Sequence, residues 1–359
     1  MNYDHFISIN QKIIALNTDA YFIVDIASNH DGELSRAKEL IWLAKESGAD
    51  AVKFQHFKAN KIVSDFGFKQ LGTQLSHQAT WNKSVYDIYT QYECNREWNE
   101  EIAKTALEVG IDLMTTPYDE EAVLLMDKYV VAYKIGSGDI TYTEFIELVS
   151  QKGKPVILAT GASTIEDVDR AIHTITKYNS EIALLQCNTN YTGDIENFKY
   201  INLRVLLSYA NKYPNMVLGL SDHTPGHATV LGAISLGARI IEKHFTDDNN
   251  RLGPDHLFSM NPQSWEEMIK RSRELQFALG DGIKKIEVNE KDTVQVQRRS
   301  LRVIRDISAG TILKEHDIES LRPAPLGSIP PYCLMDTVGR ILINSKLSGD
   351  AIFDDDLEG

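Results

Sequence analysis

Short apolar runs alternate with amphipathic stretches along most of this chain. The runs are rich in Val and Ile and nearly continuous, as in parallel strands that are buried on both faces. Eight of them occur: YFIVDIAS (21–28), ADAVKFQ (49–55), IDLMTTP (111–117), VAYKIGSG (131–138), PVILATG (155–161), IALLQCN (182–188), MVLGLSD (216–222) and ARIIEKHF (238–245).

The segments between these runs predict helices, because their apolar residues recur at spacings of three and four. The clearest segments are residues 33–48, 96–110, 164–179 and 262–280. Eight strand–helix units in about 260 residues match the size of a (β/α)8 barrel. A doubly wound open sheet is the alternative, but it normally has fewer units and a Gly-rich phosphate fingerprint, which we do not find. We therefore predict the α/β class and a (β/α)8 TIM barrel.

Two further segments differ from the repeating pattern. The polar stretch from about His56 to Cys94 contains several aromatic residues and is too long for an ordinary connection, so we expect a lid or an active-site insertion. Beyond residue 285 the chain has short strand-like runs, Gly and Pro turns and no long helix. We predict a catalytic barrel over residues 1–285, followed by a linker and a small, mainly β domain over residues 286–359.

The charge and cysteine content narrow the possible partners. The 359-residue chain has a formal net charge of −14, which makes it a poor candidate for binding nucleic acid or an anionic membrane. The N-terminal residues lack the basic start and apolar core of a signal peptide, and no run is long enough to span a bilayer. The three cysteines form no CxxC pair. We expect a soluble cytoplasmic protein with reduced thiols.

Polar residues at the carboxyl ends of the strands indicate the catalytic end of a barrel. Side chains alternate along a strand, so Ser221 and His223 share one face of their strand, and Glu242 and His244 share one face of the next. The imidazoles of His223 and His244 can therefore converge on one point. Two neutral imidazoles suit a divalent transition metal with positions left for water and substrate.

Cations and hydroxyl groups at the same end could bind a phosphate; they are Lys53, Lys134, Thr116, Ser137 and Ser221. Each of these residues also has a structural interpretation. A histidine at a strand end is often only hydrogen-bonded, a lysine there can pair with a barrel acid, and Ser or Thr can cap the next helix. The concentration of such residues at one end of the barrel favours a catalytic site.

Several motifs resemble signature stretches of the sialic acid synthase (nonulosonic acid synthase) family. They are AYKIGSGD (132–139), LGLSDHTPG (218–226) and EKHFTDDNNRLGPDHLFSMNP (242–262), with DAVKFQ (50–55) and GKPVILATG (153–161) in support. The stretches RRSL (298–301), DISAGTIL (306–313) and LRP (321–323) resemble the antifreeze-like (SAF) domain of that family. The resemblance covers essentially the whole chain.

The resemblance implies condensation of phosphoenolpyruvate with an open-chain N-acetylmannosamine-type hexose, or a related 2-acetamido or 2,4-diacetamido hexose. The products would be a nonulosonic acid and phosphate. It implies a divalent metal, with Mn2+ first and Mg2+ or Co2+ as alternatives, held by His223 and His244, and Asp25 or Asp139 as the base. By position it assigns substrate binding to Lys53, Gln55, Thr116, Lys134, Ser137, Thr189, Tyr191, Ser221, Asp255 and Arg322.

The chain departs from the family pattern at four positions. Asp25 and Asp139 stand where Glu is usual, Ala159 where Ser is common and Thr189 where Asn is frequent. Both Glu-to-Asp differences shorten a carboxylate by one methylene, which bears on the choice of sugar more than on the reaction. N-acetylmannosamine, its 6-phosphate and a 2,4-diacetamido-6-deoxy-hexose all stay open as substrates.

Two other classes of function also stay open. A Schiff-base aldolase would use Lys134 or Lys53 as its nucleophile, and a non-catalytic carbohydrate-binding barrel would need no metal pair. The last barrel helix ends at the face opposite the catalytic one, so the small domain is poorly placed to reach its own barrel mouth. We therefore expect a domain-swapped homodimer in which Arg322 completes the sugar site of the partner subunit, as the resemblance also implies.

Overall fold

The computed structural model describes residues 5–358, apart from the side chains of Ser76 and Thr80. The chain divides into two compact units, of which the first ends at Gly280 and the second begins at Asp281. This division lies slightly before the boundary predicted after residue 285. No helix among the described residues is both long enough and apolar enough to cross a membrane.

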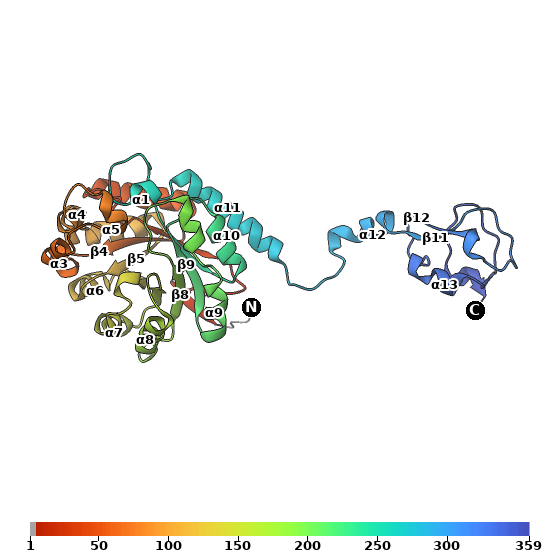
Figure 1. Cartoon of the computed structure of the whole chain (residues 1–359), viewed down its shortest axis with the longest axis horizontal. Helices are drawn as coiled ribbons and strands as arrows, with labels where there is room; N and C mark the ends of the chain where they lie inside the picture. Colours follow the sequence, from red (N-terminus) through yellow and green to blue (C-terminus); the bar gives the residue numbers. More distant parts are fainter. Residues whose placement is uncertain (1–4, 359) are drawn as a thin grey trace. The chain divides into compact units, whose positions relative to one another are not determined.

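Within the described residues, the first unit is a closed barrel of eight parallel strands, as predicted (Figure 1). Each predicted apolar run supplies one strand, and the pairing of the last strand with the first closes the barrel. The strands are β3 (Tyr21–Asp25), β4 (Ala51–His56), β5 (Asp112–Pro117), β6 (Ala132–Ile135), β7 (Val156–Ala159), β8 (Ile182–Cys187), β9 (Val217–Asp222) and β10 (Ile240–His244).

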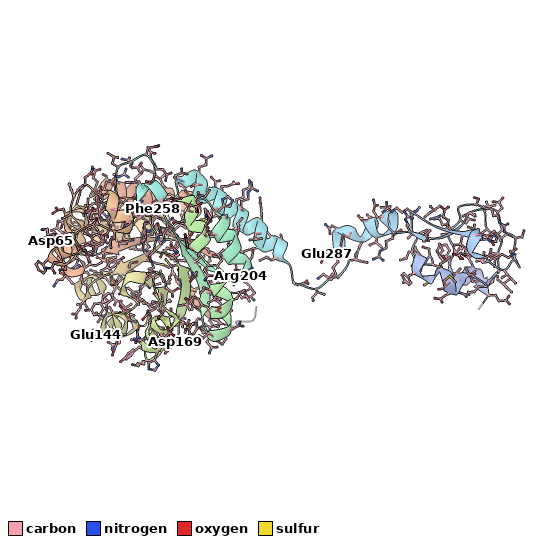
Figure 2. All side chains as sticks on the ribbon, viewed as in Figure 1. Asp65, Glu144, Asp169, Arg204, Phe258 and Glu287 are labelled. Carbon is pink, nitrogen blue, oxygen red and sulfur yellow. The ribbon has the colours of Figure 1, made fainter. Side chains whose placement is uncertain are left out.

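Helices surround the barrel and bury its outward apolar side chains (Figure 1). Helix α11 begins at a clear sequence signal: Asn261 caps its N-terminus, and Pro262 occupies its first position. Exposed charged side chains, such as Glu144 and Arg204, cover the outer surface (Figure 2). The helices of the first unit are α1 (Leu34–Glu46), α2 (Ala59–Ile62), α3 (Asp65–Gln70), α4 (Val85–Gln91), α5 (Asn99–Val109), α6 (Glu120–Met126), α7 (Thr143–Ser150), α8 (Ile165–Thr176), α9 (Val205–Lys212), α10 (Ala228–Ser235) and α11 (Pro262–Leu279).

An N-terminal hairpin closes the amino end of the barrel. Its strands β1 (Phe6–Ile9) and β2 (Lys12–Ala15) pair antiparallel. Side chains of Ile7, Ile9 and Ile14 join the apolar cluster that fills the barrel interior. Apolar side chains therefore fill the barrel interior at this end.

The second unit is built on short antiparallel strand pairs, as expected for the small domain. Strand β11 (Ser300–Val303) pairs with β12 (Ile318–Leu321), and β13 (Ile341–Leu342) pairs with β14 (Leu357–Glu358). The unit has its own apolar core, which includes Leu301. Its helices are α12 (Lys291–Gln297) and α13 (Leu334–Thr337).

We expect Ile14→Ala to lower the free energy of unfolding by about 2–5 kcal/mol, because it leaves a cavity where the hairpin plugs the barrel. Ile13→Ala is the matched control, since Ile13 is 55% exposed and Ile14 is 0% exposed. The control should change the free energy by less than about 0.5 kcal/mol. Urea unfolding followed by circular dichroism measures both, and equal effects would show that the hairpin is not a plug.

Candidate active site

A cavity of about 340 Å³ opens at the carboxyl ends of the barrel strands. This is the end at which the sequence predicts the catalytic residues. Strand ends and the loops that follow them form one part of its wall, and the insertion between β4 and β5 forms another. The predicted site residues that line the cavity are Asp25, Gln55, Lys134, Ser137, Asp139, Tyr191, Ser221, His223, His244 and Asp255.

Four residues of the predicted site do not line the cavity. Lys53, Thr116 and Thr189 are not among the described residues that line the cavity. Lys53 is 0% exposed and donates a hydrogen bond to Thr116 Oγ1 at 2.9 Å, so both side chains belong to the barrel interior. Arg322 lies in the second unit, where its Nε donates to the carbonyl oxygen of Gln297 at 2.5 Å.

A cluster of buried charges forms the floor of the cavity; Asp25 and Lys134 line the cavity, and Lys53 and Glu242 pair with them from the barrel interior. Lys53 Nζ lies 2.7 Å from Asp25 Oδ2 and 3.9 Å from Glu242 Oε2. Lys134 Nζ donates to Glu242 Oε1 at 2.8 Å, and Ser221 Oγ donates to the same oxygen at 3.0 Å. Glu242 is therefore the partner of the lysines, which was one of the interpretations open from the sequence.

Burial alone would disfavour the ionised form of each group in this cluster. The Lys53 and Lys134 ammonium groups outweigh burial and hold the pKa values of Asp25 and Glu242 below their usual range. Burial likewise opposes the charge on Lys134, but the nearby Glu242 carboxylate raises its pKa. Asp25, Glu242 and Lys134 are thus ionised at neutral pH.

His223 and His244 lie side by side at the ends of β9 and β10, with ring centroids 5.3 Å apart. The Tyr191 ring packs on His223 at a centroid distance of 4.1 Å. Burial lowers the pKa of His223 to about 4 and that of His244 to about 3, so both imidazoles are neutral. His223 Nδ1 lies 2.8 Å from the carbonyl oxygen of Asn188, which makes Nδ1 the protonated nitrogen and leaves a lone pair on Nε2.

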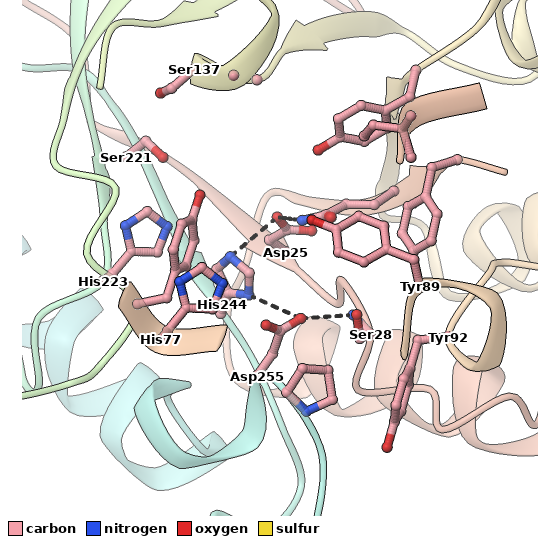
Figure 3. A pocket seen from close by; sticks show the side chains of 18 of the residues that line it. Asp25, Ser28, His77, Tyr89, Tyr92, Ser137, Ser221, His223, His244 and Asp255 are labelled. Atoms are coloured by element: carbon pink, nitrogen blue, oxygen red, sulfur yellow. Dashed lines mark hydrogen bonds and ion pairs between the residues drawn. The ribbon is translucent and has the colours of Figure 1, made fainter. Parts of the chain in front are cut away.

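This pair of imidazoles has the chemistry of a divalent metal site. The neutral ring is the form that binds metals, and His244 Nδ1 is buried without a hydrogen-bond partner among the described residues. Carboxylate oxygens of Asp25 and Asp255 lie 3.7 and 3.9 Å from the two nitrogens of His244 (Figure 3). Residues 5–358 contain no group of three or more His, Cys, Asp and Glu side chains arranged to hold a metal ion. Because His223 and His244 supply only two ligands, an ion bound by them would keep positions open for water and substrate.

Two further acids, Asp139 and Asp255, line the cavity and ionise less readily than an ordinary carboxyl group. Burial raises the pKa of both Asp139 and Asp255 to about 6. One oxygen of Asp139 is buried and has no hydrogen-bond partner in the described part of the chain. Asp255 accepts a hydrogen bond from the backbone N–H of Ser28 at 3.1 Å. A carboxyl group with a pKa near neutrality and a free oxygen, such as Asp139, is suited to accept a proton.

The insertion contributes an aromatic wall whose residues the sequence analysis did not identify. Ring centroids of Phe57 and Tyr89 lie 5.2 Å apart, and those of Tyr89 and Trp81 lie 6.4 Å apart. His77 continues the series, at 5.6 Å from Trp81 and 5.0 Å from Tyr191. The rings thus extend from the insertion to the residue that packs on the histidine pair. The aromatic content of the segment was the signal for this wall, but it does not show which rings turn inward.

Comparison with known proteins agrees with this fold. The model of the NeuB family matches residues 40–284, and the model of the SAF domain matches residues 298–358. The N,N'-diacetyllegionaminic acid synthase of Campylobacter jejuni is 35% identical over 84% of this chain and 90% of that protein. The pseudaminic acid synthase of the same species is 31% identical over 95% of this chain and 97% of that protein. The crystal structure of the spore coat polysaccharide biosynthesis protein SpsE from Bacillus subtilis is similar over 99% of both chains, with 28% identity and a TM-score of 0.64.

We expect Lys53→Met to lower the free energy of unfolding by about 3–5 kcal/mol, because it leaves the Asp25 carboxylate buried without its closest cation. Lys12→Met is the control, since Lys12 pairs with Asp50 but its side chain is 43% exposed. The control should cost at most about 1 kcal/mol. Denaturant unfolding at neutral pH measures both variants, and a loss no larger than that of the control would contradict the role given to Lys53.

Proposed function

The chain belongs to the NeuB family of nonulosonic acid synthases, and on this premise we propose that it condenses phosphoenolpyruvate with an open-chain 2-acetamido or 2,4-diacetamido hexose. The products are a nonulosonic acid and phosphate. The observation that carries the proposal is the cavity itself, which joins a neutral histidine pair, a paired ionic floor and a carboxyl group with a free oxygen. A binding protein would need none of these reactive groups.

His223 and His244 are the residues that would hold a divalent metal, with Mn2+ first and Mg2+ or Co2+ as alternatives. Bound there, the ion would supply a Lewis acid for the sugar aldehyde. Lys134 lines the cavity and supplies a cation for phosphoenolpyruvate, and Gln55, Ser137 and Ser221 offer it hydrogen-bonding groups. Lys53 acts indirectly, by holding Asp25 in place at 2.7 Å.

Asp139 is the base that the geometry supports best. The C3 carbon of phosphoenolpyruvate attacks the sugar carbonyl, water adds at C2, and phosphate leaves by C–O cleavage. The Asp25 carboxylate already accepts from Lys53, from Gln55 Nε2 at 2.9 Å and from the backbone N–H of Ala27 at 3.1 Å. Asp139 has an unoccupied acceptor oxygen and a pKa of about 6, so it can take the proton of the water.

The lining of the cavity supports a sugar without a phosphate group. Lys134 is the one Lys or Arg among the described lining residues, and phosphoenolpyruvate would occupy it. The apolar side chains of Phe57, Ile62 and Trp81 form part of the wall. A sugar 6-phosphate would find no free counter-charge there, whereas acetamido methyl groups and a deoxy carbon would find apolar contact.

A Schiff-base mechanism has less support from the same residues. A lysine nucleophile must be neutral, and the pKa of Lys134 is raised because Glu242 outweighs the effect of burial. Lys53 is fully buried against Asp25 and does not face the cavity in the described structure. Borohydride trapping with substrate would detect the covalent adduct that this alternative requires.

Phosphate release tests the proposed reaction. The protein with phosphoenolpyruvate and Mn2+ should release phosphate with an unphosphorylated 2-acetamido or 2,4-diacetamido hexose, and little with N-acetylmannosamine 6-phosphate. Chelation, or His223→Ala with His244→Ala, should reduce the rate by several powers of ten, since each ~1.4 kcal/mol of lost barrier lowering is about tenfold. Full turnover of the double variant after chelation would rule out the metal, and preference for the 6-phosphate would rule out the sugar assignment.

We expect kcat/KM to rise with pH through about 6, the pKa of Asp139, because the base must be ionised. Asp139→Asn should lower the rate about 10²–10⁴-fold and remove this limb of the profile.

Stability provides a second measurement of the Asp139 pKa. The pKa of Asp139 is higher in the folded protein than in the unfolded chain, so between pH about 4 and 6 the folded protein binds more protons at this residue. The contribution of Asp139 to the free energy of unfolding therefore falls as pH rises across that window. Asp139→Asn should reduce the fall to the part contributed by Asp255, whose pKa is also raised to about 6. An unchanged pH–rate profile would show that Asp139 is not the base.

We also propose that the site is shared between two subunits, with Arg322 completing the sugar pocket of the partner in a domain-swapped homodimer. Mixing inactive His223→Ala chains with inactive Arg322→Ala chains should restore part of the activity, because some heterodimers regain one intact pocket. Size-exclusion chromatography with differently tagged chains verifies that heterodimers form. Heterodimers without recovered activity would contradict the shared site.

A further inference from the structure

Asp222 and Lys243 form a buried ion pair on the side of the barrel wall that faces away from the cavity. They are direct partners in the ladder between β9 and β10, and they are 2% and 1% exposed. Lys243 Nζ donates to Asp222 Oδ2. Neighbouring outward positions carry apolar residues, such as Leu220 and Ile241. Burying charges here costs desolvation that an apolar pair would avoid, so the pair needs an explanation beyond packing.

Hydrogen bonds of this pair involve both neighbours of His223 in the chain, Asp222 before it and Thr224 after it. The Asp222 carboxylate accepts from the backbone N–H of Thr224 at 3.2 Å and from its hydroxyl at 2.9 Å. It also accepts from the hydroxyl of Thr229, on helix α10, at 2.7 Å. Lys243 Nζ donates in addition to the carbonyl oxygen of Thr224 at 2.6 Å. His223 therefore lies between two residues that this network fixes.

The network lies where the ladder between the two strands ends. In the described register, Lys243 and Asp222 are the last partners of β9 and β10. His223 and His244 each follow one of these two residues directly. The position of one histidine relative to the other is therefore set by the ion pair and its threonine contacts, together with the hydrogen bond from His223 Nδ1 to the carbonyl of Asn188.

We propose that Asp222 and Lys243 are positioning residues that hold His223 at the distance from His244 that a divalent cation requires. The proposal rests on the metal site described under the proposed function. Both side chains point away from the cavity, on the opposite face of their strands from Ser221 and Glu242. Their effect on a bound cation is therefore transmitted through the backbone and not by contact.

Titration of the metal-free, full-length protein with Mn2+, followed by electron paramagnetic resonance of the free ion, tests this proposal. Asp222→Asn should weaken Mn2+ binding about 10–100-fold, the range found for groups that orient metal ligands, while the KM for phosphoenolpyruvate changes little. Asp112→Asn is the matched control. Its carboxylate accepts hydrogen bonds from Tyr21 and Asn10, both at 2.6 Å, at the amino end of the barrel. The control should reduce stability and leave Mn2+ affinity unchanged.

A second pair of variants keeps the test decisive if Asp222→Asn fails to fold. Thr224→Val removes the hydroxyl that bonds to Asp222 and should weaken Mn2+ binding, whereas Thr224→Ser retains the hydroxyl and should bind like wild type. Wild-type Mn2+ affinity in folded Asp222→Asn or in Thr224→Val would overturn the proposal and leave the pair a purely structural role. If the wild-type protein itself bound no Mn2+, the metal site of the proposed function would fail, and the positioning role with it.

Discussion

The paired charges buried inside the barrel are the constraint on which the rest of the site depends. Asp25, Lys53, Lys134 and Glu242 come from four different strands, β3, β4, β6 and β10, and each lies within 4 Å of an opposite charge. Charges in such a poorly solvated place are tolerated only when they are paired. The four strand ends must therefore keep their relative positions, and the cavity is built on a floor that cannot shift without exposing an unpaired ion.

This floor also sets the electrostatics of the cavity above it. Its acids and ammonium groups balance one another, so it offers little net positive charge to the neighbouring carboxyl groups. Burial then dominates at Asp139 and Asp255, whose pKa values rise to about 6. It also dominates at His223 and His244, whose pKa values fall to about 4 and about 3. One physical cause, removal from water, thus produces neutral imidazole rings and a carboxyl group able to exchange a proton.

Side-chain alternation explains why so much of the site could be predicted from sequence. A period of two assigns Ser221 and Glu242 to the inner face of neighbouring strands, and the hydrogen bond between their side chains at 3.0 Å agrees with it. Lys53 obeys the same alternation and points inward, but it lies too deep to line the cavity. Depth depends on the tilt and stagger of the strands around the closed barrel, which the sequence of one strand does not encode.

The sequence by itself determined the barrel, the small second domain, and the inward or outward face of each strand residue, because these follow from local periodicity. Only the tertiary structure decided that Lys53 pairs with Asp25, that His77 brings the insertion to Tyr191, and that Asp222 and Lys243 enclose the backbone of His223. Each of these contacts joins residues from different elements. They depend on how the strands and loops come together in the barrel, and no local pattern in the chain specifies which side chains that assembly brings into contact.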